Sequence, residues 1–131
     1  MIITKKCLIG MLMIIHQSLH SMPTDFSGRW CWDENSKHSN FSLTFKKVGD
    51  RFKGSYSAVI LDGRRTDGNE DAFNFKNDYT AIVQTKLITG WQFSVALVQL
   101  KLLNSNQMEW LIIKSPYGEF LAPYKGTLTR C

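Results

Sequence analysis

Short segments in which apolar and polar residues alternate fill most of this chain, and turn-forming residues separate them. Side chains on a β-strand point alternately to its two faces, so an alternation with a period of two predicts a strand with one buried face. Phe41–Lys46, Phe52–Ile60 and the apolar positions of Met108–Ile112 follow this pattern. The pattern therefore indicates an all-β chain.

The connections between these segments are short. Gly49–Asp50 joins two alternating segments as a tight turn, which predicts a hairpin. Asn104–Asn106 and Ser115–Gly118 are further turn signals, and the chain shows no convincing helix, internal repeat or linker. Counting the segments gives seven or eight strands. We therefore expect one domain, a single antiparallel up-and-down β-barrel of about eight strands.

The middle of the chain is harder to interpret. Asp62–Asp71 is the longest polar stretch and contains two Asp-Gly pairs, so we expect an exposed, flexible loop. Weaker strands are expected around Ala72–Phe75 and Thr80–Ile88. In the longer strand that follows, Phe93 shares one face with Trp91, Val95 and Leu97, and we expect this face to point inward.

The N-terminal residues have the features of a signal peptide. Lys5–Lys6 are followed by nine apolar residues, Cys7–Ile15, and Leu19–Ser21 offers a cleavage site with a small residue at its end. Nine residues are too few to span a bilayer, which takes about 20. The alternative is a buried N-terminal strand. We expect residues 1–21 to be a signal peptide, residues 22–131 to form the barrel, and the protein to be exported to a periplasm or the extracellular space.

The charge of the chain points to no particular partner. Of the 16 basic residues, cleavage would remove Lys5 and Lys6, which leaves 14 basic residues against 11 acidic ones, a net charge of +3. These charges are spread along the chain and form no basic stripe, so nucleic-acid binding is not expected. No segment after the signal peptide is apolar enough to suggest a membrane contact.

Four short motifs resemble those of avidin-like members of the calycin superfamily of barrels. They are FSGRW (Phe26–Trp30), FKGSYSAV (Phe52–Val59), EWLI (Glu109–Ile112) and LTR (Leu128–Arg130), in the same order and with similar spacing. The resemblance implies that Gly28, Trp30 and Arg130 form a structural signature. In that family the final cation lies over the first tryptophan, across the seam where the barrel closes.

The two remaining cysteines lie in the expected first strand and at the end of the expected last one, next to the same seam. After signal cleavage Cys31 and Cys131 are left, and in an oxidising compartment such a pair is most simply a disulfide. If the first and last strands pair as the resemblance implies, the two sulfur atoms are neighbours. A bridge closing the 100 residues between them would stabilise the fold by at most about 4.7 kcal/mol. The alternative is a free Cys31 and a frayed Cys131.

The resemblance also identifies candidate ligand contacts. Tyr56 and Trp110 match positions at which avidins hold biotin, whereas Trp32, Ala58 and Gly126 replace polar residues that bind it. Biotin recognition depends on buried polar groups that match those of the ligand. The resemblance therefore implies the fold and does not imply biotin binding.

Aromatic residues dominate the expected interior. An eight-stranded barrel is just wide enough to be filled by side chains or to hold one small ligand. Seven aromatic residues are expected to point inward: Trp30, Trp32, Phe41, Phe45, Tyr56, Phe93 and Trp110. Among them we expect Trp32, Tyr56, Trp110, Phe45 and Phe93 to be ligand-binding residues, and the alternative is that the aromatic side chains simply fill the barrel.

Catalytic chemistry finds little support in the sequence. His38 is the histidine that the mature chain keeps, and no nucleophile and acid can be grouped around it. The spacing of Asp67, Asn69 and Asp71 only faintly resembles a calcium loop. We expect neither an enzyme, nor a metal site, nor a cofactor.

Two classes of binding function stay open. The first is a carrier that holds a small apolar or aromatic ligand at the barrel mouth, with Asp62–Asp71 as a lid. The second is a protein-binding module, such as an inhibitor of an exported hydrolase, that uses surface loops around a filled barrel. The expected partner is accordingly a small molecule or an exported protein. The sequence indicates no oligomeric state.

Overall fold

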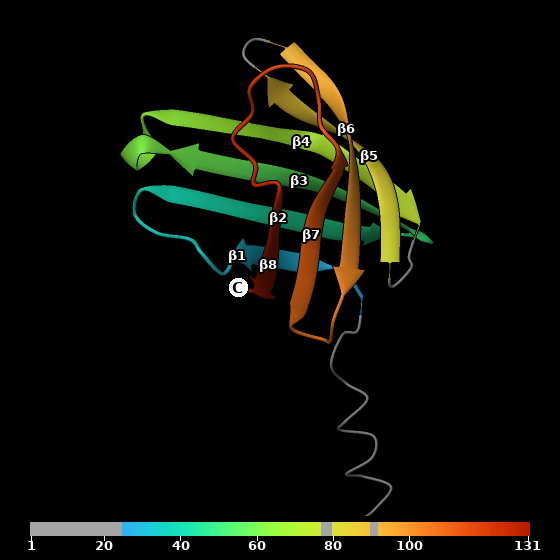
Figure 1. Ribbon diagram of the computed structural model, residues 1–131. Coiled ribbons are helices and arrows are strands. Elements are labelled where there is room, and N and C mark those ends of the chain that lie inside the picture. The colour runs from blue at the N-terminus through green and yellow to red at the C-terminus, as the bar shows by residue number, and fades with distance from the viewer. Residues whose placement is uncertain (1–24, 77–79, 90–91) are drawn as a thin grey trace, which may run out of the picture.

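The computed structural model describes residues 25–76, 80–89 and 92–131, which form one curled antiparallel sheet (Figure 1). Its strands are β1 (Gly28–Trp32), β2 (Ser39–Val48), β3 (Arg51–Ile60), β4 (Arg65–Lys76), β5 (Thr80–Thr89), β6 (Gln92–Leu102), β7 (Gln107–Lys114) and β8 (Lys125–Arg130). Neighbours in the sheet follow the order β4-β3-β2-β1-β8-β7-β6-β5. The predicted all-β antiparallel barrel of about eight strands is confirmed, and it is nearly closed.

Residues 1–21, the predicted signal peptide, lie outside the described residues. The described residues include no helix long and apolar enough to cross a membrane.

Arg130 joins the two ends of the barrel domain. Its guanidinium carbon lies 4.3 Å from the ring centroid of Trp30, its register partner on β1. The same group donates Nε to the carbonyl of Ser105 at 2.5 Å and Nη2 to the carbonyl of Asp25 at 2.6 Å, and Nη1 bonds the carbonyl of Ser27. One planar cation thus covers an aromatic ring and holds three carbonyls from two backbone segments, a geometry suited to Arg. The signature implied by the resemblance, an Arg130 over Trp30, is present in the structure.

Gly28 and Phe26 complete this arrangement. Gly28 has a φ of 108°, and a Cβ there would lie 3.0 Å from Nη1 of Arg130, so glycine suits both the backbone and the close approach. Just before it, the carbonyl of the fully buried Phe26 accepts a hydrogen bond from Nε1 of Trp30 at 2.8 Å. The segment that enters β1 therefore closes this end of the barrel.

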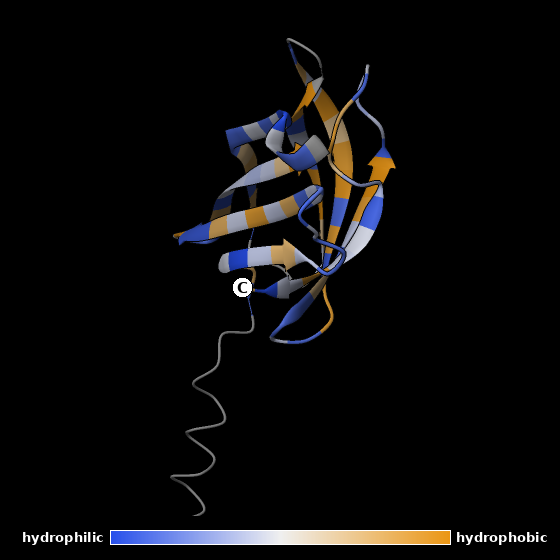
Figure 2. Cartoon of the chain, turned by 90° about the vertical axis from the view of Figure 1, so that its left-hand side faces the viewer, coloured by the Kyte–Doolittle hydropathy of each residue, from blue (hydrophilic) through white to orange (hydrophobic). Residues whose placement is uncertain are grey.

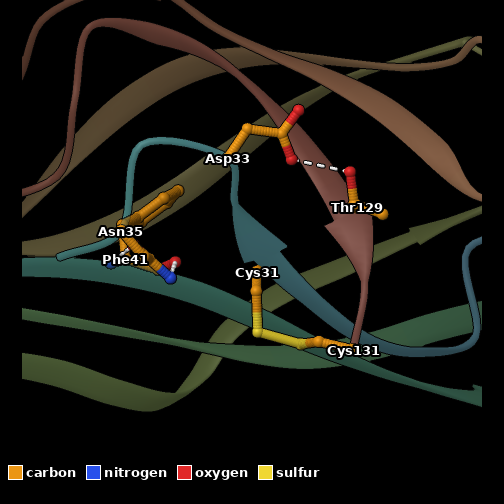
Figure 3. The surroundings of a disulfide bond; sticks show 6 residues. All are labelled: Cys31, Asp33, Asn35, Phe41, Thr129 and Cys131. Carbon is orange, nitrogen blue, oxygen red and sulfur yellow. Dashed lines mark hydrogen bonds between the residues drawn. A yellow bond between two sulfur atoms is a disulfide. The ribbon is translucent and has the colours of Figure 1, made fainter.

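The disulfide lies on the outside of the same seam. Cys31 and Cys131 are bonded, with their Cα atoms 5.8 Å apart (Figure 3). The backbone N–H of Cys131 also bonds the carbonyl of Arg29 at 3.1 Å, and Thr129 donates to Asp33 at 2.6 Å. The predicted Cys31–Cys131 bridge is confirmed, and it follows from the pairing of β1 with β8.

The opposite side of the barrel is closed by side chains. β4 and β5 are the two ends of the strand order, so no backbone ladder joins them within the described residues. Instead the Thr85 hydroxyl donates to the carbonyl of Ala72 at 2.8 Å, and the Asn69 amide donates to the carbonyl of Lys86 at 3.2 Å. Exposed backbone edges invite pairing with other chains, and bonds of this kind satisfy part of these edges. β4 and β5 therefore form a second, weaker seam.

Aromatic rings pack across the interior. Phe26 meets Phe75 at a centroid distance of 5.4 Å and Phe52 at 5.9 Å, in edge-to-face contacts near the closed end. Further along, Trp110 from β7 lies 4.9 Å from Phe41 on β2 and 6.2 Å from Phe73 on β4. Rings from strands on different walls thus touch one another at this level. Figure 2 shows the underlying pattern, with hydrophobic and hydrophilic bands alternating along the strands.

The turns on either side of β3 differ from one another. The predicted hairpin at Gly49–Asp50 is confirmed, because Val48 pairs with Arg51 across it. The predicted Asp62–Asp71 loop is wrong, since only the 3-10 turn η1 (Leu61–Gly63) and Arg64 separate β3 from β4.

Residues 65–71 join β4 because backbone pairing outweighs their polar composition. Asp67 pairs with Ala58 and Gly68 pairs with Ser57, so the ladder to β3 continues through the polar stretch. Residues 70–72 lie opposite Ser55 alone, so β4 carries two extra residues where the register shifts between Gly54 and Tyr56. Strand propensity depends on such neighbours, and Asp and Gly do not by themselves prevent pairing.

The face of β6 that points inward also differs from the prediction. Ala96, Val98 and Leu100 are buried, whereas Phe93 is 60% exposed and Val95 is 54% exposed. The prediction that Phe93 points inward is therefore wrong. β6 is apolar on both faces, so its alternation could not decide which face is buried. Aromatic rings already occupy the centre of the barrel, and the smaller side chains of the other face fit beside them.

The Arg130 arrangement makes a direct prediction for stability. Arg130→Lys keeps the charge but cannot cover the Trp30 ring and reach three carbonyls at once, so the free energy of unfolding should fall by about 2 kcal/mol. Urea unfolding measures this change. Arg29→Lys, on the exposed face of β1, is the matched control and should change stability by less than about 0.5 kcal/mol. Equal effects of the two substitutions would contradict the role of Arg130.

Candidate functional site

The barrel mouth lies opposite the end closed by Phe26. Phe41, Ala58 and Asp67 are neighbouring inner-face positions on β2, β3 and β4, and all three are buried. The connection between β7 and β8, residues 115–124, turns back over this end (Figure 1). The backbone N–H of its Leu121 lies near Asp67 and opposes the rise in the pKa of that carboxyl. We call residues 115–124 the cap.

Trp110 is held between the interior and the cap. Its Nε1 donates to the carbonyl of Pro123 at 2.6 Å, and its indole is 1% exposed. The neighbouring Ile112 N–H bonds the carbonyl of Tyr124 at 2.8 Å. The polar group of Trp110, which the resemblance offered as a ligand contact, is therefore used to fix the cap.

Tyr56 is likewise engaged within the protein. Its hydroxyl accepts the backbone N–H of Ile88 at 2.7 Å, which links β3 to β5 across the weaker seam. Burial raises the pKa of Tyr56 to about 12, with a further rise from the negative charge of Asp67 and an opposing effect of the Ile88 N–H. The phenol thus acts as a neutral bridge inside the barrel wall.

Trp32 and Gly126 fit together as one packing unit. A Cβ at Gly126 would lie 2.8 Å from Cδ1 of Trp32 and closer still to its Nε1, so the indole lies against the glycine backbone. Both positions are departures from the biotin-binding pattern. The structure explains them together, because the large Trp32 requires the absence of a side chain on β8.

The other two predicted ligand residues lie apart from each other. Phe45 is buried among rings, 5.2 Å from Phe73 and 5.4 Å from Phe75. Phe93 is on the outer surface. The structure therefore brings Trp110 and Phe41 together near the mouth and keeps Phe45 in the packed interior.

Asp67 is the polar group that the sequence interpretation misplaced. It is 9% exposed, and its Oδ2 has no hydrogen-bond partner among the described residues. Burial raises the pKa of this carboxyl, while Arg65 and the Leu121 N–H oppose the rise. Asp71 faces solvent, so the calcium-like spacing does not gather its members at one place. Within the ranges that the structure describes, no group of three or more metal-binding side chains is found.

A groove lies on the outer surface of β5, β6 and the start of the cap. It measures about 980 Å³, and its lining includes Phe93, Val95, Leu97, Lys114 and Tyr117. The backbone N–H of Tyr117 bonds the Ser94 hydroxyl at 2.8 Å, which fixes the cap along one edge. The Tyr117 ring is 91% exposed.

Exposed apolar side chains continue from this groove over three neighbouring strands. Ile82 on β5 is 62% exposed, and Leu111 and Ile113 on β7 are 41% and 47% exposed. Ile82 and Leu111 both pair with Gln99 of β6, so they lie in one row across the sheet. We define the outer patch as Ile82, Phe93, Val95, Leu111, Ile113 and Tyr117.

The outer face of β2, β3 and β4 is different. Its exposed residues are mostly polar or charged: Thr44, Lys46, Lys53, Ser57, Thr66, Glu70, Asn74 and Lys76. The apolar character of β6 on both faces was the signal in the sequence for the outer patch, because apolar residues that fill both faces of a strand cannot all point into one core.

His38 does not assemble a catalytic group. Its Nδ1 lies 2.6 Å from Oδ1 of Asp62, and the two side chains are 63% and 61% exposed. A pair so open to solvent neither excludes water nor holds a substrate.

Comparison with protein families, with curated proteins and with solved structures finds no match.

The raised pKa of Tyr56 predicts how stability depends on pH. Below pH 10.0 the phenol is neutral in both folded and unfolded chains; between pH 10.0 and about 12 only the unfolded chain ionises, so stability falls as pH rises. Absorbance titration of phenolate in the folded protein should show one tyrosine titrating near 12, and Tyr56→Phe should remove it. Titration of every tyrosine near the ordinary value would contradict this assignment.

The fit of Trp32 to Gly126 predicts coupled substitutions. Gly126→Ala should destabilise the fold by about 1–3 kcal/mol, because the added methyl overlaps the indole. In the background Trp32→Leu the same change should cost much less, since the overlapping ring is gone. The measurement is urea unfolding of the four proteins of this double-mutant cycle. Additive effects would show that the two positions do not contact each other in solution.

Proposed function

We propose that the chain is a non-enzymatic binding protein that recognises another protein through the outer patch. The observation that carries this proposal is the difference between the two outer faces: β5–β7 expose several large apolar side chains, whereas β2–β4 expose mostly polar ones, with Val48 as an apolar exception. Monomeric soluble proteins rarely expose large contiguous apolar patches, and such patches mark interaction sites. Single exposed apolar residues would need no such explanation.

The packed interior favours this function over the carriage of a large apolar ligand. Rings of Phe41, Phe73 and Trp110 touch across the barrel, and the polar groups of Tyr56 and Trp110 bond the protein itself. An eight-stranded barrel has room for side chains or for a small ligand, and here side chains take much of that room.

Charge around the patch suggests the chemistry of the partner. Lys114 lines the groove, and the exposed Lys86 pairs with Val95 beside it. A second copy placed symmetrically on this face would bring like charges together, because a two-fold interface sets the same patch against itself. An apolar segment with acidic residues beside it complements the patch better. We therefore propose a different protein, with an exposed apolar and acidic segment, as the partner.

Photo-crosslinking tests this proposal. A photoreactive residue at Phe93, in protein produced by its own cell, should yield one discrete adduct with a second protein, and the same residue at Thr44 should yield none. Phe93→Ser should weaken binding of the identified partner by about tenfold or more, because a buried aromatic anchor carries about 1.4 kcal/mol or more at such interfaces. Lys114→Glu should weaken it further if the partner is acidic.

Two results would contradict the proposal. One is equal crosslinking from positions 93 and 44, which would indicate contact without specificity. The other is an adduct of the chain with itself, together with a dimer in light scattering that Phe93→Ser dissociates. That result would assign the outer patch to self-association.

A further inference from the structure

A second surface, separate from the outer patch, lies on the outer face of β1–β4. These four strands are neighbours in the sheet, so cations that are dispersed over residues 29–76 of the sequence come together there (Figure 1). We define the basic stripe as the five cations on this face near the Gly49–Asp50 end of the strands: Arg29, Lys46, Arg51, Lys53 and Lys76. The charges form no stripe in the sequence, and only the strand pairing gathers them.

The strand register sets like charges directly opposite one another. Lys46 on β2 pairs with Lys53 on β3, and Arg51 on β3 pairs with Lys76 on β4. Neighbouring strands are about 5 Å apart, and alternate residues along one strand are about 7 Å apart. Like charges at such opposed positions destabilise a sheet. The fold therefore keeps two repulsive pairs side by side.

Arg51 brings a further charge to the first pair. Its Nε donates to Oδ1 of Asn74 at 2.6 Å, and its Nη2 donates to the carbonyl of Asn74 at 3.2 Å. Asn74 is the register partner of Lys53 on β4. The guanidinium is thus held beside Lys53, and three positive groups lie close together across β2, β3 and β4.

The chain supplies no counter-charge for these groups. Within residues 25–76, 80–89 and 92–131, no cation of the basic stripe forms an ion pair with a carboxylate. Two acidic residues border it, Asp50 in the hairpin turn and Glu70 opposite Ser55, and neither is bonded to the stripe. An anionic partner would remove the repulsion between the cations. Charge complementarity therefore assigns this face to an anion that spans several strands.

The side chains around the cations select the class of anion. Thr44 is exposed between Arg29, its register partner on β1, and Lys46, and its other partner on β3 is Ser55. Hydroxyl groups of this kind both donate to and accept from sugar hydroxyls. Among the described residues of β1–β4, no aromatic side chain is exposed, and Val48 is the large apolar residue that is. The stripe thus lacks the rings that stack single-stranded bases or anchor proteins, and the apolar face that enters a membrane.

We propose that the basic stripe binds a linear sulfated polysaccharide, which lies diagonally across β1–β4. Its sulfate groups accept hydrogen bonds from Lys46, Lys53 and Arg51, and its sugar hydroxyls bond Thr44. The close spacing of the cations matches a densely sulfated chain better than a polysaccharide charged by carboxylates alone. This function goes beyond the proposed recognition of a protein and does not rest on it, because the outer patch is on a different wall of the barrel.

Heparin titration at several salt concentrations tests the site. Lys46→Gln with Lys53→Gln should weaken heparin binding by about tenfold or more, and should lower the slope of log Kd against log salt by about one to two, because fewer counterions are released. The matched control is Lys101→Gln with Lys125→Gln, which removes the same charge from exposed positions on β6 and β8. It should change the Kd by less than about twofold.

Two further measurements make the result specific. Urea unfolding of the Lys46→Gln, Lys53→Gln variant should show a stability equal to or above that of the unsubstituted chain, because a repulsive pair is removed; this also shows that the variant folds. Thr44→Val should weaken heparin binding by about threefold, since it removes a hydrogen bond to the sugar and no charge.

Several results would overturn the proposal. Equal weakening by the two double variants would show that heparin responds to net charge alone, and unchanged binding by Thr44→Val would remove the role of the sugar. Duplex DNA or vesicles containing phosphatidylserine that bind as tightly as heparin would assign the stripe to nucleic acid or to a membrane. The photo-crosslinking above detects protein adducts, which a polysaccharide does not form, so failure here leaves the proposed protein-binding function untouched.

Discussion

The contact of Arg130 with Trp30 is the interaction on which this barrel depends. A meander of antiparallel strands curls into a barrel here because its first and last strands pair with each other. These two strands lie far apart in the sequence. Arg130 stabilises that pairing in one step, since its guanidinium covers the β1 tryptophan and bonds three carbonyls from the segments around it. The Cys31–Cys131 disulfide then ties the same two strands on the outer side.

Closure between β1 and β8 has consequences at the opposite wall. β4 and β5 become the ends of the sheet, and side chains join them where a backbone ladder is lacking. Tyr56 takes part in this second seam through its hydroxyl. This tyrosine, which was predicted to bind a ligand, is therefore used here to hold the wall together. Trp110 is used in a similar way, to hold the cap.

The sequence predicted those features that depend on residues of unambiguous chemistry. Clean alternation in β2 and β3 predicted their buried faces. The seam between Trp30 and Arg130 was predicted from the family resemblance, and the Cys31–Cys131 bridge from the two cysteines left after signal cleavage. Prediction was wrong where a segment allowed two readings. Asp62–Asp71 is polar enough for a loop, yet residues 65–69 pair with β3, the strand that directly precedes them, as the second arm of a hairpin. In β6 both faces are apolar, so only the filled interior determines that Ala96 points in and Phe93 points out.

These same ambiguities concealed the outer patch and the burial of Asp67. The outer patch was hidden by the expectation that Phe93 lies inside, and Asp67 was hidden by its assignment to a loop. An outer face rich in apolar side chains and an interior crossed by aromatic contacts together support recognition on the outside of the barrel.

Carbene footprinting of the protein in the cell fraction that contains it, compared with the purified chain, tests this central claim most directly. The account predicts reduced labelling of Phe93, Val95 and Tyr117 in the cell fraction, with unchanged labelling of Ser57 and Thr66, which are exposed on β3 and β4 away from the basic stripe. Equal labelling of the outer patch in both samples, or protection confined to β2–β4, would contradict it.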